Sequence, residues 1–129
     1  MGQKVKVWFP AIRGGSGVDI HTSRLAWALQ RYGLGAEISW FSTYFQFAPF
    51  LLSRLAAPPG ANIVHALSWY GYAFQRKNLP LVVSEQLDVL DPIYRPYKSI
   101  AQAAFHQTLV RRFMTKSFAA ASAVTAVSH

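Results

Sequence analysis

The sequence predicts an α/β domain built on a doubly wound parallel sheet. Short runs of β-branched and aromatic residues alternate along the chain with longer segments of helical periodicity. The 129 residues suit one domain, and 52% of them are hydrophobic while only 14% are charged. This balance excludes a disordered chain, and the absence of cysteine excludes disulfides, cysteine-bound zinc and thiol catalysis.

Five β-strands are expected, each a short apolar run bounded by polar or turn-forming residues. They cover residues 5–9, 36–41, 62–66, 81–83 and 123–127. Pro10 is expected at or just beyond the end of the first strand, because its missing N–H is tolerated there.

The first helix is expected over residues 18–32. Its apolar stripe consists of Val18, Leu25, Ala28, Leu29 and Tyr32. Ser16 followed by Asp19 resembles a capping box, and Gly33 suits the left-handed conformation that ends a helix.

The second helix is expected over about residues 96–118, with Pro96 in its first turn. Its stripe consists of Tyr97, Ile100, Ala101, Ala104, Phe105, Leu109 and Phe113. A further helix is expected before the Pro-Pro-Gly break at residues 58–60.

Ligands of a doubly wound sheet bind outside the carboxyl ends of its strands. The loop 13–17 follows the first strand, and its glycines let the backbone approach an anion beside the free N–H groups of a helix start. It is not a dinucleotide fingerprint, because Ile20 stands where the third glycine belongs, and no Walker A tripeptide occurs in the chain. A tight turn without a ligand remains the alternative.

The loops after the third and fourth strands also contain residues that could bind a ligand. Aromatic faces and hydroxyls after the third strand suit a polyhydroxylated ligand, although packing is an equal alternative, as it is for His65 within the strand. The loop after the fourth strand holds three of the five acidic residues, Glu85, Asp88 and Asp91. They could recognise hydroxyls or act as a general base, or they could simply cap the loop.

Four motifs follow one another in a fixed order: residues 14–18 with 21–29 and Gly33, then residues 62–66, 81–85 and 121–128. In this order they resemble the N-terminal, Rossmann-like domain of a GT-B glycosyltransferase of the glycosyl-transferase family 4 type, over essentially all 129 residues. The resemblance implies an enzyme of two such domains that transfers a sugar from a nucleotide-sugar donor to a glycan or lipid-linked acceptor, usually with retention. This chain would be the acceptor-side domain, expected to be inactive without the donor-binding domain.

The resemblance also implies roles for individual residues. Those matching the loop against the donor diphosphate are Gly14, Gly15, Ser16 and Gly17. Those on the acceptor side are Ser68, Trp69, Tyr70 and Gln86, and those facing the reacting sugar as catalytic groups are Glu85 and Asp88. Leu67 and Gln86 stand where the family often has histidines, and glutamine cannot titrate. No metal or other cofactor is implied.

The charge favours anionic partners. Thirteen Lys and Arg against five Asp and Glu give a net charge of +8. Nucleic acid is disfavoured, because the basic residues are scattered and only Arg111 and Arg112 are adjacent. Apolar residues crowd the segment 40–52 and Arg54 follows, which is typical of a peripheral contact with an anionic membrane. The alternative is that this segment forms core together with the surface that the donor-binding domain would cover.

The location expected from the sequence is cytoplasmic, with membrane contact at the inner face, because the N-terminus lacks the apolar stretch of a signal peptide. No apolar window is long enough to span a bilayer. A non-catalytic sugar-binding or membrane-surface module remains the alternative function.

Overall fold

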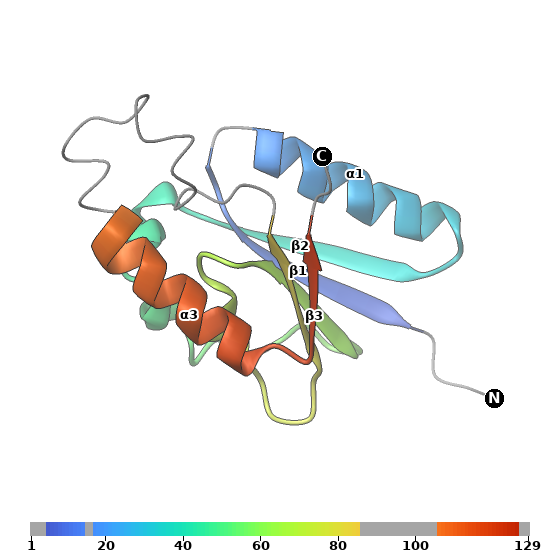
Figure 1. Cartoon of the computed structure of the whole chain (residues 1–129). Coiled ribbons are helices and arrows are strands. Elements are labelled where there is room, and N and C mark those ends of the chain that lie inside the picture. The colour runs from blue at the N-terminus through green and yellow to red at the C-terminus, as the bar shows by residue number, and fades with distance from the viewer. Residues whose placement is uncertain (1–4, 15–16, 86–105, 127–129) are drawn as a thin grey trace.

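A computed structural model describes residues 5–14, 17–85 and 106–126 (Figure 1). Its strands form one parallel sheet in the order β2-β1-β3-β4-β5. The strands are β1 (Lys6–Ile12), β2 (Gly35–Phe41), β3 (Ile63–Leu67), β4 (Leu81–Glu85) and β5 (Ala123–Ala126). The predicted fold class, a doubly wound Rossmann-like sheet, is therefore confirmed, and each predicted strand exists within a few residues of its expected bounds.

Helices lie on both faces of the sheet (Figure 1). The helix α1 (Gly17–Arg31) packs on one face, over β1 and β2. The opposite face carries α3 (Arg111–Ala120) and three short 3₁₀ helices, η1 (Thr43–Gln46), η2 (Pro49–Leu52) and η3 (Gly71–Phe74). Right-handed crossovers require this division, because the chain moves from β1 to β2 in one direction and from β3 to β5 in the other. None of the helices described is long and apolar enough to cross a membrane.

The larger apolar core lies between the sheet and the 3₁₀ helices. Trp8 is fully buried in it, packs edge-on against Phe74 with 5.7 Å between ring centroids, and donates its indole N–H to Ser39 Oγ at 2.9 Å. On the other face a smaller core joins Val7 and Phe9 to Ala26 of α1. These contacts pin β1, the central strand, from both sides.

The end of α1 follows the expected signal. Gly33 has φ +84°, its N–H donates to the Gln30 carbonyl at 3.0 Å, and the Leu34 N–H donates to the Leu29 carbonyl at 3.0 Å. This is the Schellman pattern, which needs a left-handed residue at its turn. Tyr32 is exposed, which corrects the predicted stripe: the helix ends at Arg31, so Tyr32 is already part of the turn. The side chain of Val18 lies outside the described residues.

Pro10 lies inside β1, not at its end as expected. β1 pairs with β2 along its whole length, but with β3 only at Val7 and Trp8. The backbone of Lys6 faces β3, since its carbonyl accepts from Asn62 at 2.9 Å, so Pro10, four residues on, faces the same side. Its missing N–H therefore falls where β3 no longer pairs, which is why the strand tolerates it.

The later helices also differ from expectation. The segment before residues 58–60 forms only the short η1 and η2. Of the helix predicted over residues 96–118, residues 96–105 lie outside the described part of the chain. The described segment 106–126 begins with a π-helical turn, His106–Val110, which leads into α3. Leu109 is exposed, which corrects the expected stripe, whereas Phe113 is buried as expected, together with Val110, Met114 and Ser117. A π turn holds more residues than a period of 3.6 assumes, so the expected stripe is displaced at its start.

Candidate functional site

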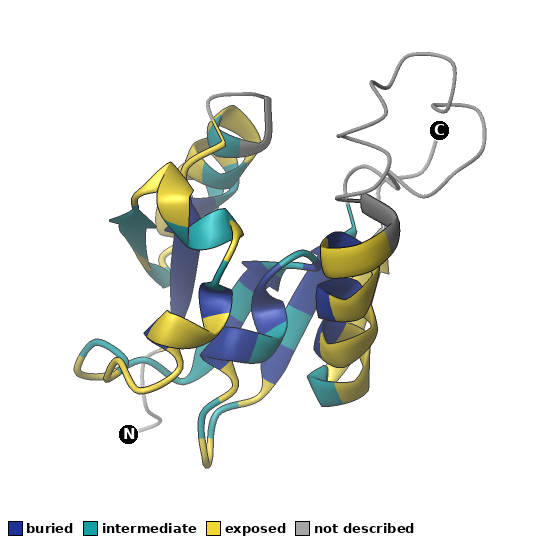
Figure 2. Cartoon of the chain, turned by 90° about the vertical axis from the view of Figure 1, so that its left-hand side faces the viewer, coloured by how far each residue is buried: buried dark blue, intermediate teal, exposed yellow. Residues whose placement is uncertain are grey.

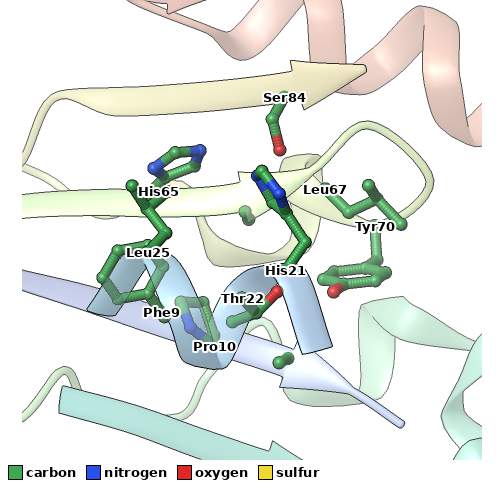
Figure 3. A pocket seen from close by; sticks show the side chains of 11 residues that line it. Phe9, Pro10, His21, Thr22, Leu25, His65, Leu67, Tyr70 and Ser84 are labelled. Carbon is green, nitrogen blue, oxygen red and sulfur yellow. The ribbon is translucent and has the colours of Figure 1, made fainter. Parts of the chain in front are cut away.

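The strand order reverses at β1, which makes the gap between β1 and β3 the topological switch point of the sheet. The two strands pair only at their amino ends and separate toward their carboxyl ends. A shallow pocket lies in this separation (Figure 3); its side chains enclose about 10 Å³, and the rest of the hollow is open to solvent. Pro10 lines the pocket, and because it offers no N–H to β3 it helps to keep the strands apart.

The pocket combines apolar walls with a few polar groups, as ligand sites commonly do. Its apolar lining is Phe9, Pro10, Ala11, Leu25, Ala66 and Leu67. Its polar lining is His21 and Thr22 from α1, His65 from β3, Tyr70 after β3, and Ser84 from β4. Figure 3 shows His21 and Ser84 directed toward each other across β3. The pocket thus brings two imidazoles and three hydroxyls together at one place.

His65 is half-buried, and its ring lies against Phe9 with 5.2 Å between centroids. Burial lowers the pKa of His65 below its usual value, and the nearby imidazole of His21 lowers this pKa further. His65 is therefore neutral at pH 7, with one nitrogen to donate and one to accept a hydrogen bond. His21 is exposed at the amino-terminal part of α1 and offers a second imidazole.

Tyr70 is buried between the pocket and the larger core. Burial raises the pKa of its phenol, the carboxylate of Asp19 raises this pKa further, and a hydrogen bond with the backbone of Ile12 opposes both. The phenol stays protonated under all physiological conditions. Its hydroxyl, directed toward α1 in Figure 3, remains available to bond with a ligand as a neutral group.

Arg13, the residue that precedes the glycines of the loop, is held in place by several contacts. The Arg13 N–H donates to the Phe41 carbonyl at 2.9 Å, and the Arg13 carbonyl accepts from Thr43 Oγ1 at 2.8 Å and from Gln46 Nε2 at 3.2 Å. The Arg13 guanidinium lies 4.6 Å from the centroid of the Trp40 ring. These contacts tie the carboxyl end of β1 to β2 and η1.

Within the loop, the Gly14 N–H donates to Asp19 Oδ1 at 3.1 Å. A carboxylate therefore holds one of the amides that the sequence assigned to an anion. Gly17 is the first residue of α1, and Gly15 and Ser16 lie outside the described residues.

The predicted acceptor residues do not gather at one place. Tyr70 lines the pocket, whereas Ser68 is fully buried and its hydroxyl has no hydrogen-bond partner in the part of the chain that the structure describes. The Ser68 N–H donates to the Ser84 carbonyl at 3.0 Å, which continues the pairing of β3 with β4. Trp69 is half-buried and packs against Val110 and Met114.

The predicted catalytic residue Glu85 ends β4. Neighbouring residues of a strand point to opposite faces, so Glu85 points away from the face on which Ser84 lines the pocket. Gln86, Asp88 and Asp91 lie outside the described residues.

Sequence reasoning assigned no site role to His21, Thr22 or Ser84. A signal for the first was present: His21 lies four residues before Leu25, which places both on the same side of a helix. No sequence pattern pointed to Ser84, because the register of β4 with β3 decides whether the Ser84 side chain faces the pocket.

Comparison of this chain with protein-family models, with curated proteins and with solved structures finds no match. The resemblance to glycosyltransferases therefore rests on the motifs in the sequence alone.

Proposed function

We propose that this chain is the acceptor-side domain of a glycosyltransferase and that its switch-point pocket receives a hydroxylated group of the acceptor. The observation that carries the proposal is the pocket itself, because it lies where doubly wound sheets bind ligands and is lined by several hydrogen-bonding groups. A nucleotide-sugar donor would be held by a second, donor-binding domain, as the sequence resemblance implies.

The lining fits a sugar better than it fits a nucleotide phosphate. His65 is neutral and Tyr70 is protonated, so both present uncharged donors and acceptors, and none of the described residues that line the pocket is a lysine or an arginine. The enclosed space suits about one hydroxyl group of a sugar, and the apolar side chains of Phe9, Leu25 and Leu67 lie around it.

The roles proposed for other residues follow the resemblance. Gly14, Gly15, Ser16 and Gly17 would lie against the donor diphosphate, with the Gly14 amide released from Asp19 when the anion binds. Glu85 and Asp88 would act near the reacting sugar, and Gln86 would bond with the acceptor. Transfer would proceed without a metal ion.

Saturation-transfer NMR of the purified chain with hexoses, hexosamines and a nucleoside-diphosphate hexose tests the proposal. We expect a free sugar to bind, and His21→Ala to weaken its binding about three- to tenfold through the loss of a hydrogen-bonding group. Ser23→Ala is the matched control, because Ser23 is an exposed neighbour on α1 that does not line the pocket. Equal binding by both variants would contradict the assignment of the pocket.

Transfer from a radiolabelled nucleotide sugar distinguishes the proposal from the alternative of a non-catalytic sugar-binding module. We expect no transfer by the isolated chain, and transfer once a donor-binding domain is supplied with it. Sugar binding that never leads to transfer, with any such domain, would favour the alternative.

A further inference from the structure

The segment that contains η1 and η2 exposes four large apolar side chains, which together form the apolar patch: Tyr44, Phe47, Phe50 and Leu51. Each is between 55% and 84% exposed, although all four fall within eight consecutive residues. Isolated exposed apolar residues need no explanation, but such a dense group is typical of an interaction surface.

The apolar patch is held outward by a fixed backbone. Pro49 and Leu52 of η2 are buried against the core, so their neighbours Phe50 and Leu51 must point outward. Beneath them Arg76 donates to the carbonyls of Leu52 at 3.0 Å and Leu55 at 2.8 Å. The exposure therefore belongs to the folded state of this segment.

Cations lie beside the apolar patch. Arg54 is exposed directly after η2. On the other side Tyr72 joins the patch to α3: it forms a hydrogen bond with the backbone of Phe50, and its ring lies 5.5 Å from Lys116 Nζ. Burial raises the pKa of Tyr72, and the bond to Phe50 and the charge of Arg112 oppose that rise. Arg112 and Lys116 therefore lie close to Phe50.

Among the described residues, the helical segments beside the apolar patch carry no negative charge. The segments η1, η2, η3 and α3 contain no Asp or Glu. Figure 2 shows exposed residues of the short helices and of α3 on one side of the molecule. In the described part of the chain, the charged side chains beside the apolar centre are cations. This combination matches a surface with an apolar interior beneath a layer of negative charge. A protein partner would need an acidic rim of matching outline, whereas a bilayer needs only its headgroups.

We propose that the apolar patch, with Arg54, Arg112 and Lys116, docks this domain on an anionic lipid bilayer. Phe47 and Phe50 enter the headgroup region, and the three cations lie against lipid phosphates. This proposal is independent of the pocket and of the proposed transfer reaction.

Sedimentation of the purified chain with vesicles tests the proposal. We expect binding to vesicles of phosphatidylcholine with 30% phosphatidylglycerol, and weak binding to pure phosphatidylcholine. The variant Phe47→Ser/Phe50→Ser should bind roughly 30-fold more weakly, since each half-exposed ring loses part of its transfer free energy. The control is Ile20→Ser/Trp27→Ser, because Trp27 and Ile20 on α1 are 58% and 55% exposed, as Phe47 and Phe50 are.

A second pair of variants tests the charges. Arg112→Gln/Lys116→Gln removes two cations beside the apolar patch, and Arg24→Gln/Arg31→Gln removes two from the exposed side of α1. Both change the net charge equally, so a purely global attraction would weaken both alike. We expect the first variant to bind roughly 30-fold more weakly and the second to change little.

Circular dichroism checks that each variant remains folded. Equal loss of binding in the patch variant and the α1 control would overturn the proposal, as would undiminished binding of the patch variant. Dimerisation of the chain that the Phe47→Ser/Phe50→Ser variant abolishes, without vesicle binding by the unsubstituted chain, would assign the surface to a second copy instead.

Discussion

Gly71→Ala is the substitution whose cost the structure defines most closely. Gly71 begins η3, buried between β4 and α3. A Cβ at this position would lie 3.1 Å from Val83 Cγ2 and 3.6 Å from the Cβ and Oγ of Ser117. The φ angle of Gly71 is not in the left-handed region, so crowding alone opposes a larger residue.

The neighbours have little freedom to move. Carbon atoms prefer separations of about 3.5–4.0 Å, so the contact with Val83 is strongly repulsive. Ser117 is held because its Oγ accepts the Tyr72 N–H at 2.9 Å, and Val83 is fully buried. Overpacking of this kind costs about 1–3 kcal/mol, so we expect Gly71→Ala to lower the free energy of unfolding by that amount.

A double-mutant cycle isolates the cause. Val83→Ala removes Cγ2 and should itself cost about 2 kcal/mol through lost burial and a cavity. In that background the methyl group added by Gly71→Ala enters the vacated space, so this second substitution should cost close to nothing. Urea unfolding followed by far-UV circular dichroism measures all four proteins. Simple additivity of the two costs would refute the reasoning, because the crowding would then not involve Val83.

Three further results are expected. Burial lowers the pKa of His65 below 6.5, so as the pH falls this imidazole takes up a proton more readily in the unfolded chain than in the folded one. The free energy of unfolding is therefore highest above about pH 6.5 and declines below it. His65→Leu should reduce the fall in Tm between about pH 7.5 and 5.5. An unchanged fall would argue against this. Trp8→Phe should cost about 2–3 kcal/mol in urea unfolding, because Ser39 loses its donor and a void forms; a cost below about 0.5 kcal/mol would be inconsistent with the buried indole. Gly33→Ala should lower the free energy of unfolding by about 1–2 kcal/mol, because φ is +84° and alanine disfavours the left-handed region. Gly33→Asn should lower it less, because asparagine tolerates that region and no neighbouring atom crowds the site. Equal losses in the two variants would point to another cause.

The parallel sheet and its strands were predictable because each depends on local residues. Buried strands of a parallel sheet are short apolar runs, and the sequence shows them directly. The end of α1 was equally local, because Gly33 alone supplies the left-handed turn. The glycine loop was placed correctly between β1 and α1 for the same reason.

The pocket was harder to predict because it depends on register between distant segments. Pro10 indicated a strand end, but the separation of β3 from β1 allows the strand to continue through it. His65 and Ser84 share the pocket only because β3 and β4 pair with Leu67 opposite Ser84. Leu109 was misplaced because no sequence pattern announces the π turn before α3.

The central claim is that the switch-point pocket binds a hydroxylated ligand between His21 and His65. NMR of the imidazole carbons during titration with the sugar that binds tests it most directly. We predict that the resonances of both histidines shift together and saturate with one dissociation constant, and that His21→Ala weakens the effect on His65. Saturable binding that leaves both imidazole resonances unmoved would contradict the account.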